Sequence, residues 1–407
     1  MSRLISYYGD DFTGSTDVIE ALASYGVRTA LFTRIPTATE FAPFADFEAF
    51  GLAGTSRSQT PEWMDRHLPE AFAWLKSLGA DFCHYKVCST FDSSPRIGSI
   101  GRALEIGLSL FNQQRAAIII GAPQIKRYTF AGHLFAAYQG KIYRIDRHPV
   151  MSVHPVTPMN ESELLLHLAL QSPAAVELID VHDAATQEAA GTTLLQLLAQ
   201  NLPFVVGSSG VEYALMVALN NKYEQQFEVV QPVDQMLVIS GSVSSTTERQ
   251  IAYAKSHGFE AIRADLLNLA KGRTDVSLLQ ARVALAQGKS PLIYSAAGLD
   301  SDQSGALQEI PDGRETLSKS LGKIARQLIE EFKLKRLVIA GGDTSSHALG
   351  ELDIHALTLR FPFAKTPGSP LCLAHSANAT FNGLEVAMKG GQVGGDDYFV
   401  KLKTGLA

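Results

Sequence analysis

Two adjacent carboxylates near the start of the chain are the first residues with a clear chemical use. Asp10 and Asp11 directly follow a short apolar run, and Thr13 and Gly14 come next. Adjacent carboxylates at the end of a strand can orient a polyol, bind a metal or act as a general base. The alternative is that one of them caps a helix while the other is solvated. Because two acids beside one turn exceed what capping needs, we favour a functional role.

A second polar run combines a cation and an acid with hydroxyl groups. It extends from Lys86 through Cys88, Ser89 and Thr90 to Asp92. Lys86 could neutralise a substrate carboxylate, while the hydroxyls and Asp92 bind sugar hydroxyl groups. The alternative is a serine-rich turn that carries a surface lysine. Cys88 is expected to be a small packed side chain and not a nucleophile.

Three further residues are isolated candidates. Arg57, in the polar segment 54–58, is a second cation suited to a carboxylate, although a lone loop arginine is often only solvated. His133 and His154 stand in turns, where a structural role is the simpler interpretation.

The second half of the chain contains three clusters of glycine and hydroxyl residues, at 240–246, 341–346 and 389–397. Glycine lets backbone N–H groups approach a phosphate closely, and Ser and Thr hydroxyls add donors. Tight turns use the same residues. Because there are three such clusters, two of them directly after apolar runs, we favour a phosphate-bearing ligand. Together with the acids and cations of the first half, they would suit a group-transfer enzyme.

The apolar pattern predicts the framework that must position these residues. Five continuous apolar runs each precede a turn rich in Gly, Ser, Thr or Asp: 4–8, 117–120, 204–206, 237–239 and 337–340. Such runs, followed by helical patterns, are typical of strands buried on both faces of a parallel sheet. We therefore expect an α/β fold with mainly parallel sheets flanked by helices. Ligands of such folds bind at the carboxyl ends of the strands.

The helix after the first turn is expected to begin with Ser15, Thr16 or Asp17 as its N-cap and to stop at Gly26. Its unpaired N–H groups would face the end of the sheet, where they attract carboxylates and phosphates.

Length and composition set the outline of the molecule. A chain of 407 residues is long enough for two domains. The polar, proline-containing segment 223–235 separates two sets of strand, turn and helix. We therefore expect domains at 1–228 and 236–407, with the active site in the cleft between them.

Charge and motif content exclude several classes of protein. The net charge is −6 and no block of Lys or Arg occurs, so neither nucleic acid nor an anionic membrane is expected as a partner. Three cysteines without CxxC spacing and the lack of a long apolar stretch predict a cytoplasmic location. The chain lacks GxxxxGK[ST], GxGxxG after a strand, HExxH and GxSxG motifs. The sequence therefore lacks the motifs typical of P-loop kinases, simple dinucleotide enzymes, zincins and α/β-hydrolases.

Taken in order, these motifs resemble those of the four-carbon acid sugar kinase family over essentially the whole chain. The matching segments are 10–14, 86–93, 132–134, 154–159, 207–210, 241–246, 341–345 and 389–391. The resemblance implies an N-terminal domain that binds a sugar acid and a C-terminal domain that binds ATP. It also implies transfer of the γ-phosphoryl group to the terminal C4 hydroxyl of a tetronate, with Mg²⁺ expected alongside ATP.

The resemblance also implies residue roles. The residues expected to bind the sugar acid are Asp10, Asp11, Arg57, Lys86, Cys88, Ser89 and Thr90. The residues expected to bind the nucleotide are Ser242, Ser244, Gly341, Gly342, Asp343, Thr344, Gly390 and Gly391. The candidate catalytic residues are Asp10, Asp92 and Asp343. They could orient the hydroxyl group, act as the general base or contact the metal, and the sequence does not assign these roles among them. No residue is named as a metal ligand.

The expected substrate is 3-oxo-tetronate, because the segment 88–93 is more similar to the 3-oxo-tetronate kinase version than to the threonate or erythronate versions. D-threonate and D-erythronate are the alternatives. A non-catalytic sensor of a phosphorylated metabolite could use the same glycine clusters, whereas a serine hydrolase lacks an identifiable His/Asp pair. The expected partners are the sugar acid and ATP, and a homodimer is left open.

Overall fold

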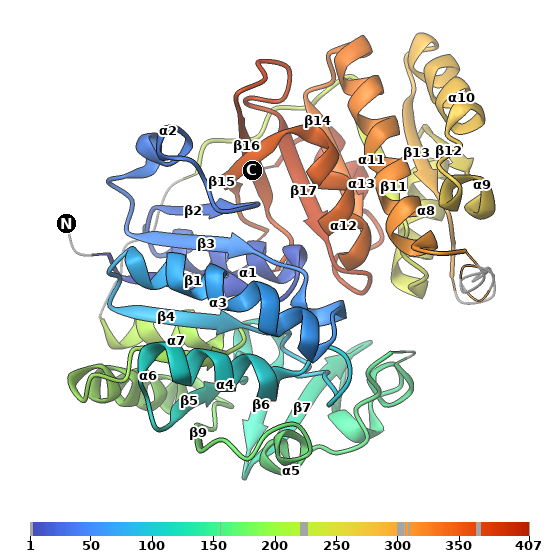
Figure 1. Cartoon of the computed structure of the whole chain (residues 1–407). Helices are drawn as coiled ribbons and strands as arrows, with labels where there is room; N and C mark the ends of the chain where they lie inside the picture. The colour runs from blue at the N-terminus through green and yellow to red at the C-terminus, as the bar shows by residue number, and fades with distance from the viewer. Residues whose placement is uncertain are drawn as a thin grey trace. The chain divides into compact units, whose positions relative to one another are not determined.

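The computed structural model describes residues 3–154, 156–219, 227–298, 305, 307, 310–363 and 368–406. The chain forms two compact units, Met1–Gln225 (unit 1) and Gln226–Ala407 (unit 2) (Figure 1). Each is built around a mainly parallel sheet flanked by helices, which confirms the predicted α/β class. Residues 223–226 of the predicted junction lie outside the described residues, and the site predicted between the domains stays a prediction.

The large sheet of unit 1 has the strand order β2-β3-β1-β4-β10-β5-β9, in which all neighbours run parallel. Its strands are β1 (Ile5–Gly9), β2 (Thr29–Phe32), β3 (Ala49–Ala53), β4 (Phe82–Lys86), β5 (Ala116–Ile119), β9 (Val176–Leu178) and β10 (Phe204–Gly207). Every residue of β1, β3 and β4 is buried. This is the burial that continuous apolar runs predict for strands covered on both faces.

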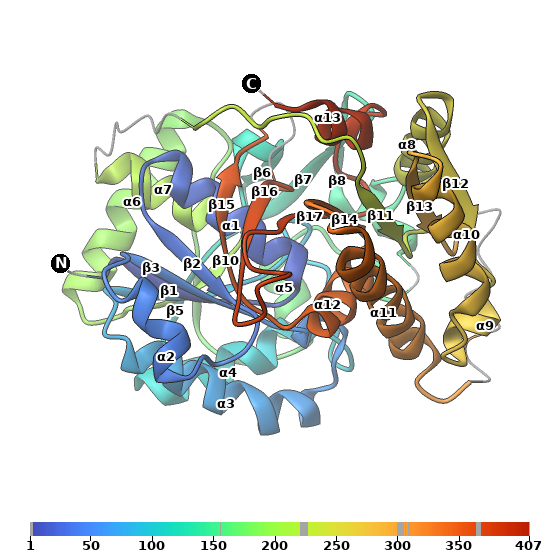
Figure 2. The ribbon, with the colours of Figure 1, turned by 90° about the horizontal axis from the view of Figure 1, so that it is seen from above.

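Helices cover both faces of this sheet. They are α1 (Phe12–Ser24), α2 (Ala38–Phe41), α3 (Pro61–Ser77), α4 (Ile100–Phe111), α5 (Leu164–Ala169), α6 (Ala184–Ala199) and α7 (Gly210–Ala218). Figure 2 shows α3 and α4 on one side of β1 and β3, and α1 and α7 on the other. The carboxyl ends of the central strands are therefore held between two packed layers.

The start of α1 differs from the sequence-based expectation. The N-cap is Asp11, whose side chain accepts a hydrogen bond from the backbone N–H of Gly14, so Ser15, Thr16 and Asp17 lie inside the helix. Asp11 has the extended backbone that an N-cap requires, with φ −141° and ψ 163°. The expected stop is confirmed, since Gly26 has a positive φ of 78° directly after the C-cap residue Tyr25.

Unit 1 also contains a small antiparallel sheet made of β6 (Arg127–Phe130), β7 (His133–Tyr138) and β8 (Lys141–Arg144). Its first residue, Arg127, exchanges two backbone hydrogen bonds with Ala122, which follows β5. The small sheet is thereby attached at the carboxyl end of a strand of the large sheet.

The sheet of unit 2 has the order β12-β13-β11-β14-β17-β16-β15, parallel from β12 to β17 and antiparallel at β16 and β15. Its strands are β11 (Leu237–Ser240), β12 (Phe259–Arg263), β13 (Ser290–Tyr294), β14 (Arg336–Ala340), β15 (Ile354–Phe361), β16 (Leu371–Ser376) and β17 (Glu385–Lys389). Its helices are α8 (Ser245–Ser256), α9 (Leu266–Ala270), α10 (Asp275–Ala286), α11 (Gly313–Phe332), α12 (Gly342–Leu349) and α13 (Tyr398–Thr404).

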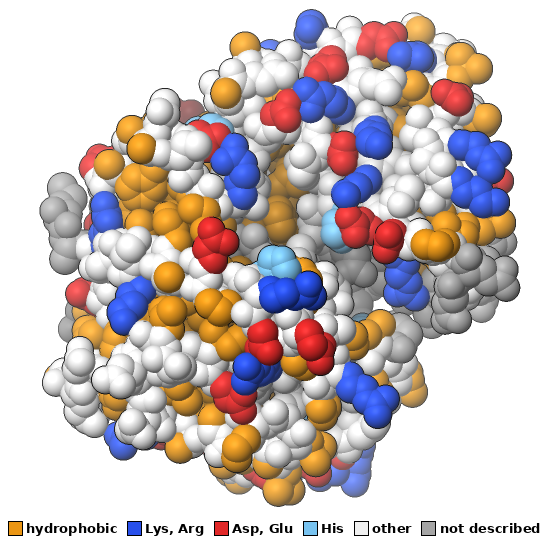
Figure 3. Space-filling view, viewed as in Figure 1, with side chains coloured by type: hydrophobic (Ala, Val, Ile, Leu, Met, Phe, Trp, Pro, Cys, Tyr) orange, Lys and Arg blue, Asp and Glu red, His pale blue; other side chains and the backbone are white. Residues whose placement is uncertain are grey.

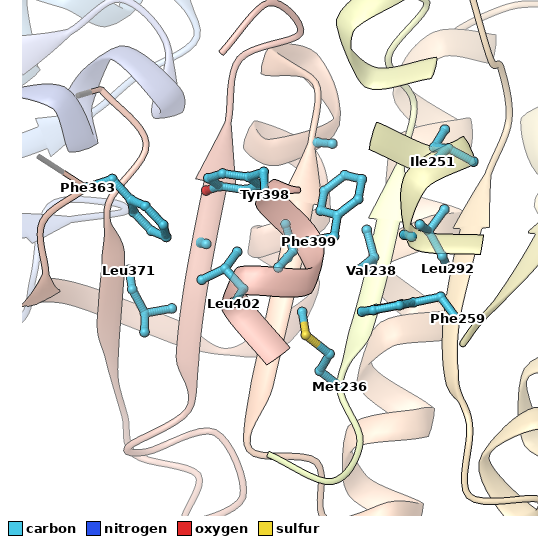
Figure 4. Packing of buried hydrophobic residues seen from close by; sticks show 14 of the residues in the cluster. Met236, Val238, Ile251, Phe259, Leu292, Phe363, Leu371, Tyr398, Phe399 and Leu402 are labelled. Atoms are coloured by element: carbon cyan, nitrogen blue, oxygen red, sulfur yellow. The ribbon is translucent and has the colours of Figure 1, made fainter. Parts of the chain in front are cut away.

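One core cluster of unit 2 is packed between the sheet and helices α8 and α13. Figure 4 shows Phe399 of α13 beside Val238 of β11, with Tyr398 and Leu402 of the same helix in the same cluster. These four side chains have 2% or less of their surface exposed. This packing places the amino-terminal end of α8 beside the carboxyl ends of the parallel strands.

Within the described ranges, no helix is long and apolar enough to cross a membrane. On the face seen in Figure 3, Lys and Arg side chains alternate with Asp and Glu side chains and form no large patch of one sign.

Candidate active site

The predicted sugar-acid residues are brought together at the carboxyl edge of the unit 1 sheet. Gly9, the last residue of β1, pairs with Ala53 of β3 and with Lys86 of β4. The backbone N–H of Asp10 donates to the carbonyl of Lys86 at 2.9 Å, and the N–H of Arg57 donates to the carbonyl of Asp10 at 3.0 Å. Three segments far apart in sequence therefore meet at one turn.

Asp10 is buried, with 4% of its surface exposed, so the alternative of a solvated carboxylate is wrong. Its Oδ1 has no hydrogen-bond partner among the described residues. Burial, followed by the negative charge of Asp11, raises the pKa of Asp10 to about 7. A buried carboxyl with a free oxygen and a pKa near neutrality has the properties of a general base.

Asp11 caps α1 and also takes part in the site. Its Oδ1 accepts from the N–H of Gly14 at 2.5 Å, and its Oδ2 accepts from the hydroxyl of Thr13 at 2.9 Å. The same Oδ2 lies 3.1 Å from Nη1 of Arg57. Its carboxylate is thus fixed by the helix end and by a cation.

Arg57 bridges two aspartates. Its Nη2 donates to Oδ1 and Oδ2 of Asp92, both at 2.9 Å, while Nη1 donates to Asp11. The side chain of Asp92 is fully buried and that of Arg57 is 27% exposed. The interpretation of Arg57 as a merely solvated loop residue is therefore wrong.

The carboxylate of Asp92 is saturated with donors. Besides Arg57, it accepts from the hydroxyl of Thr90 at 2.5 Å and from that of Thr157 at 3.1 Å. Burial would raise the pKa of Asp92, but the charge of Arg57 and the bonds from Thr90 and Arg57 outweigh burial and lower it to about 2. His154 stands behind this contact, since its Nδ1 accepts the N–H of Thr157 at 3.1 Å. A carboxylate so firmly ionised suits orientation better than proton transfer.

Lys86 is buried, with 1% of its surface exposed, so the alternative of a surface lysine is wrong. Its Nζ donates to the carbonyl of Val87 at 2.9 Å and lies 3.7 Å from Oδ2 of Asp17 on α1. Burial would lower the pKa of Lys86, but the negative charges of Asp17 and Asp10 outweigh it and raise that pKa. The site therefore contains a fixed ammonium group.

Cys88 and Ser89 lie in the turn after β4 and are partly buried. The Cys88 Sγ is 2.9 Å from the hydroxyl of Thr90. Burial raises the pKa of the Cys88 thiol, which keeps it protonated. This agrees with the prediction that Cys88 is not a nucleophile.

In unit 2 the three glycine clusters also meet at one sheet edge. Ser240, Ala340 and Lys389, the last residues of β11, β14 and β17, lie in one row of the parallel register. The N–H of Gly241 donates to the carbonyl of Ala340 at 3.1 Å, and the N–H of Gly341 donates to that of Lys389 at 3.0 Å. The clusters therefore form one continuous surface.

Close approach between these clusters requires glycine at two positions. A Cβ on Gly241 would lie 2.2 Å from the Oγ1 of Thr344, and one on Gly391 would lie 2.9 Å from the Oγ of Ser242. Gly341 adopts a φ of 115°, which disfavours other residues. Gly342 opens α12, and Gly390 precedes Gly391 in the third cluster.

Hydroxyl groups and one lysine connect the clusters. The Oγ of Ser242 accepts from the hydroxyl of Thr247 and from the N–H of Ser244, which in turn caps α8. The Nζ of Lys389 donates to Thr247 at 3.0 Å and to the carbonyl of Gly390 at 2.9 Å. Lys389 is fully buried, and burial lowers its pKa to about 7.

Several residues around both sites were not singled out by sequence reasoning. In unit 1 these are Asp17, Arg127 and Thr157, and in unit 2 they are Thr247 and the side chain of Lys389. Thr157 is 65 residues from Asp92, and Lys389 is 142 residues from Thr247. The side chain of Asp343 lies outside what the structure describes, although its backbone belongs to α12.

A metal site built from protein ligands alone is not formed by the described residues, which contain no group of three or more His, Cys, Asp or Glu side chains suited to one ion. Mg²⁺ in kinases is usually held by substrate phosphates with one or two carboxylates. The unpartnered oxygen of Asp10 is compatible with that smaller contribution.

Two protein-family models match the chain. A sugar-binding N-terminal domain model matches residues 5–246, and a nucleotide-binding C-terminal domain model matches residues 237–399. A 3-oxo-isoapionate kinase of Paraburkholderia graminis is 37% identical over 99% of this chain and 94% of its own length. A 3-oxo-tetronate kinase of Pseudomonas savastanoi pv. phaseolicola is 28% identical over 99% of this chain and 97% of its own.

A solved structure shows the same fold. A protein of Salmonella typhimurium LT2 aligns with a TM-score of 0.74 and 22% identity, covering 98% of each chain. The chain belongs to the four-carbon acid sugar kinase family, whose two domain models together match it from residue 5 to residue 399. It is a kinase, a phosphotransferase that acts on a hydroxyl of a sugar acid.

Proposed function

We propose that the protein transfers the γ-phosphoryl group of ATP to the C4 hydroxyl of a 3-oxo sugar acid. The observation that carries this proposal is the buried Asp10, with its unpartnered Oδ1 and a pKa near 7, beside the cations Arg57 and Lys86. Relatives over the full length of the chain are named 3-oxo-isoapionate kinase and 3-oxo-tetronate kinase, which supports an oxo group at C3. These two acids are therefore the first candidates, ahead of D-threonate and D-erythronate.

In this proposal Asp10 is the general base. It accepts the proton of the C4 hydroxyl as the oxygen attacks the γ-phosphorus and the bond to the bridging oxygen of ADP breaks. Asp92 is unsuited to this step because its pKa is about 2 and both its oxygens already accept from Arg57. We assign Asp92 to positioning of Arg57 and of the loop 88–92.

The other predicted residues keep their proposed roles. Asp11, Lys86, Cys88, Ser89 and Thr90 would line the sugar-acid site with Arg57. Residues proposed to hold the nucleotide are Ser242, Ser244, Gly341, Gly342, Asp343, Thr344, Gly390 and Gly391. Mg²⁺ would accompany the phosphates and neutralise their charge. The cytoplasmic location, the homodimer and the domain limits 1–228 and 236–407 stay predictions.

The test is release of ADP by the purified protein with ATP, Mg²⁺ and each of four acids: 3-oxo-isoapionate, 3-oxo-tetronate, D-threonate and D-erythronate. We expect kcat/KM to be at least about tenfold higher for a 3-oxo acid than for the two reduced acids, as for a site that pairs the oxo group. The Asp10→Asn variant is the control for catalysis by this site. Ligand binding without ADP release for any acid would favour the sensor and overturn the proposal.

A further inference from the structure

Arg127 is an arginine without a carboxylate partner among the described residues. Its Nη1 donates only to backbone carbonyls, those of Ile125 and Lys126, each at 3.2 Å. Its Nε is buried and has no hydrogen-bond partner. A buried N–H of a charged group is costly to leave unsatisfied, so this donor requires an explanation.

The environment of Arg127 differs from that of most other arginines of unit 1. Six of them form ion pairs with Asp or Glu: Arg28, Arg34, Arg57, Arg102, Arg115 and Arg144. The guanidinium of Arg127 has an N–H group without an acceptor, whereas the other six guanidinium groups are paired with carboxylates. A carboxylate from a ligand would satisfy it in the same way.

The position of Arg127 relates it to the sugar-acid site. Its N–H and carbonyl bond to Ala122 at 3.1 and 2.9 Å, which ties the start of β6 to the turn after β5. Burial lowers the pKa of Arg127, and the negative charge of Asp17 acts on it in the opposite direction. Lys86 of β4 and Ile119 of β5 both pair with Gly207 of β10, so the start of β6 lies at the edge of the sheet that carries Lys86.

The two cations proposed from the sequence are already engaged. Arg57 binds Asp11 and Asp92 through three hydrogen bonds, and Lys86 binds the carbonyl of Val87 and pairs with Asp17. Among the described residues, the Nε of Arg127 is a buried nitrogen with no hydrogen-bond partner, and no buried nitrogen of Arg57 or Lys86 is in that state.

The strand order gives a rough length for the site. β1, which ends before Asp10, and β5, which leads to Arg127, are separated by β4 and β10 in the sheet. Three strand spacings amount to roughly 14 Å. An aspartate side chain, a four-carbon acid and an arginine side chain can bridge this distance together. One end of the acid would then face the base while the other faces Arg127.

We propose that Arg127 binds the carboxylate of the sugar acid and fixes the end of the substrate opposite to the hydroxyl that is phosphorylated. This inference rests on the proposed function and names the residue that selects an acid. Arg57 then acts as a positioning residue for Asp11 and Asp92 and is not the carboxylate clamp.

The test compares the acid with its uncharged primary amide in the wild type and in Arg127→Met. Loss of a charge-assisted pair should raise KM for the acid roughly 10- to 100-fold and leave KM for ATP within about twofold. The amide should be a poor substrate of both proteins. Its KM should be the same in R127M as in the wild type, because the amide has no charge for Arg127 to pair with. Arg144→Met, on β8 of the same small sheet, is the matched control and should leave all constants unchanged.

The outcomes separate this inference from the function on which it rests. If the wild type releases no ADP with any acid, the proposed function is wrong. If the wild type is active and R127M either keeps the KM of the acid or loses acid and amide equally, the assignment of Arg127 alone is wrong. Arg127→Lys retains the charge, so it should recover part of the preference for the acid, and it serves if R127M does not fold.

Discussion

Arg57 contacts both carboxylate oxygens of Asp92 through the same nitrogen, Nη2, at 2.9 Å. The pair is buried on the Asp92 side, and the second branch of the guanidinium is bound to Asp11. One cation therefore holds two carboxylates that the sequence separates by 81 positions. A cluster of this kind is stable only while the charges balance.

The first prediction concerns this balance. Arg57→Met should lower the free energy of unfolding by on the order of 3 kcal/mol, because it leaves Asp92 buried with an unpaired charge. Arg57→Met combined with Asp92→Asn should recover part of that loss. Urea denaturation of the two single variants and the double variant measures the coupling. Strictly additive effects would contradict a direct interaction.

Asp92 should also make the free energy of unfolding depend on pH. Its folded pKa of about 2 is below the unfolded value of 3.8, so its stabilisation is complete above about pH 4 and is lost as the pH falls towards 2. Asp92→Asn should therefore flatten the decline of stability between pH 4 and pH 2, measured by urea denaturation at each pH.

The second prediction concerns Asp10, whose folded pKa of about 7 is above the unfolded value of 3.8. With this sign, the folded state is most favoured below pH 4 and loses stability as the pH rises towards 7. Asp10→Asn should lower kcat roughly 10²- to 10⁴-fold, as expected for loss of a general base. It should also raise the free energy of unfolding at pH 8 by roughly 2–4 kcal/mol.

Measuring the stability of the wild type and of Asp10→Asn at both pH 4 and pH 8 provides the control for this prediction. At pH 4 the wild type and Asp10→Asn should differ little in stability, because the wild-type carboxyl is then protonated in the folded state. A variant equally stabilised at pH 4 and pH 8 would show that the charge of Asp10 is not the cause. Turnover close to that of the wild type would remove Asp10 from the role of base.

The sequence predicted the framework of both sites because the relevant signals are local. Continuous apolar runs marked the central strands, and in parallel sheets the carboxyl ends of neighbouring strands share an edge. Asp10 and Lys86 in unit 1, and Gly241 and Gly341 in unit 2, meet for this reason. The same reasoning misplaced the cap of α1, since Asp11 and the residues after it can all serve as N-caps.

Residues that depend on tertiary packing could not be found in this way. Charged residues are usually exposed, so the burial of Lys86 and Lys389 has no local signature. Arg127 is held at the edge of the sheet by the pairing of the small sheet with the turn after β5, a long-range contact that no local pattern reveals. Thr157 and Thr247 are single hydroxyl residues whose partners lie far away in the chain.

The third prediction tests a structural ion pair in unit 2. Arg336 is 1% exposed and binds Glu385 at 2.7 Å, the carbonyl of Gln231 at 3.0 Å and the carbonyl of Leu402. It joins β14, β17 and α13. Arg336→Met should lower the free energy of unfolding by roughly 3–5 kcal/mol, because it leaves the two carbonyls without this donor and Glu385 with Arg360, 3.5 Å away, as its remaining cation.

Arg282→Met is the matched control for this variant. Arg282 pairs with Glu331 at 2.7 Å, and both side chains are at least 40% exposed. An exposed pair of this kind contributes about 0–1 kcal/mol. Equal effects of the two substitutions in urea denaturation would contradict the assigned role of Arg336.

The fourth prediction concerns Lys389, whose ammonium group is held by the hydroxyl of Thr247 and the carbonyls of Gly390 and Gly391. No carboxylate pairs with it among the described residues, and burial lowers its pKa to about 7. The charged form dominates below pH 7 and is lost above it. Because a cation beside the glycine clusters favours phosphate, affinity for ATP should fall as the pH rises through 7.

Two variants separate charge from packing at this position. Lys389→Arg keeps a charge that does not titrate, so the decline in ATP affinity above pH 7 should disappear if the larger side chain is accommodated. Lys389→Met removes the charge at every pH, and ATP affinity should be low and independent of pH between 6 and 9. Calorimetric titration with ATP measures both. A wild-type affinity that does not change across this range would show that the Lys389 ammonium does not act on the phosphates, whatever its pKa.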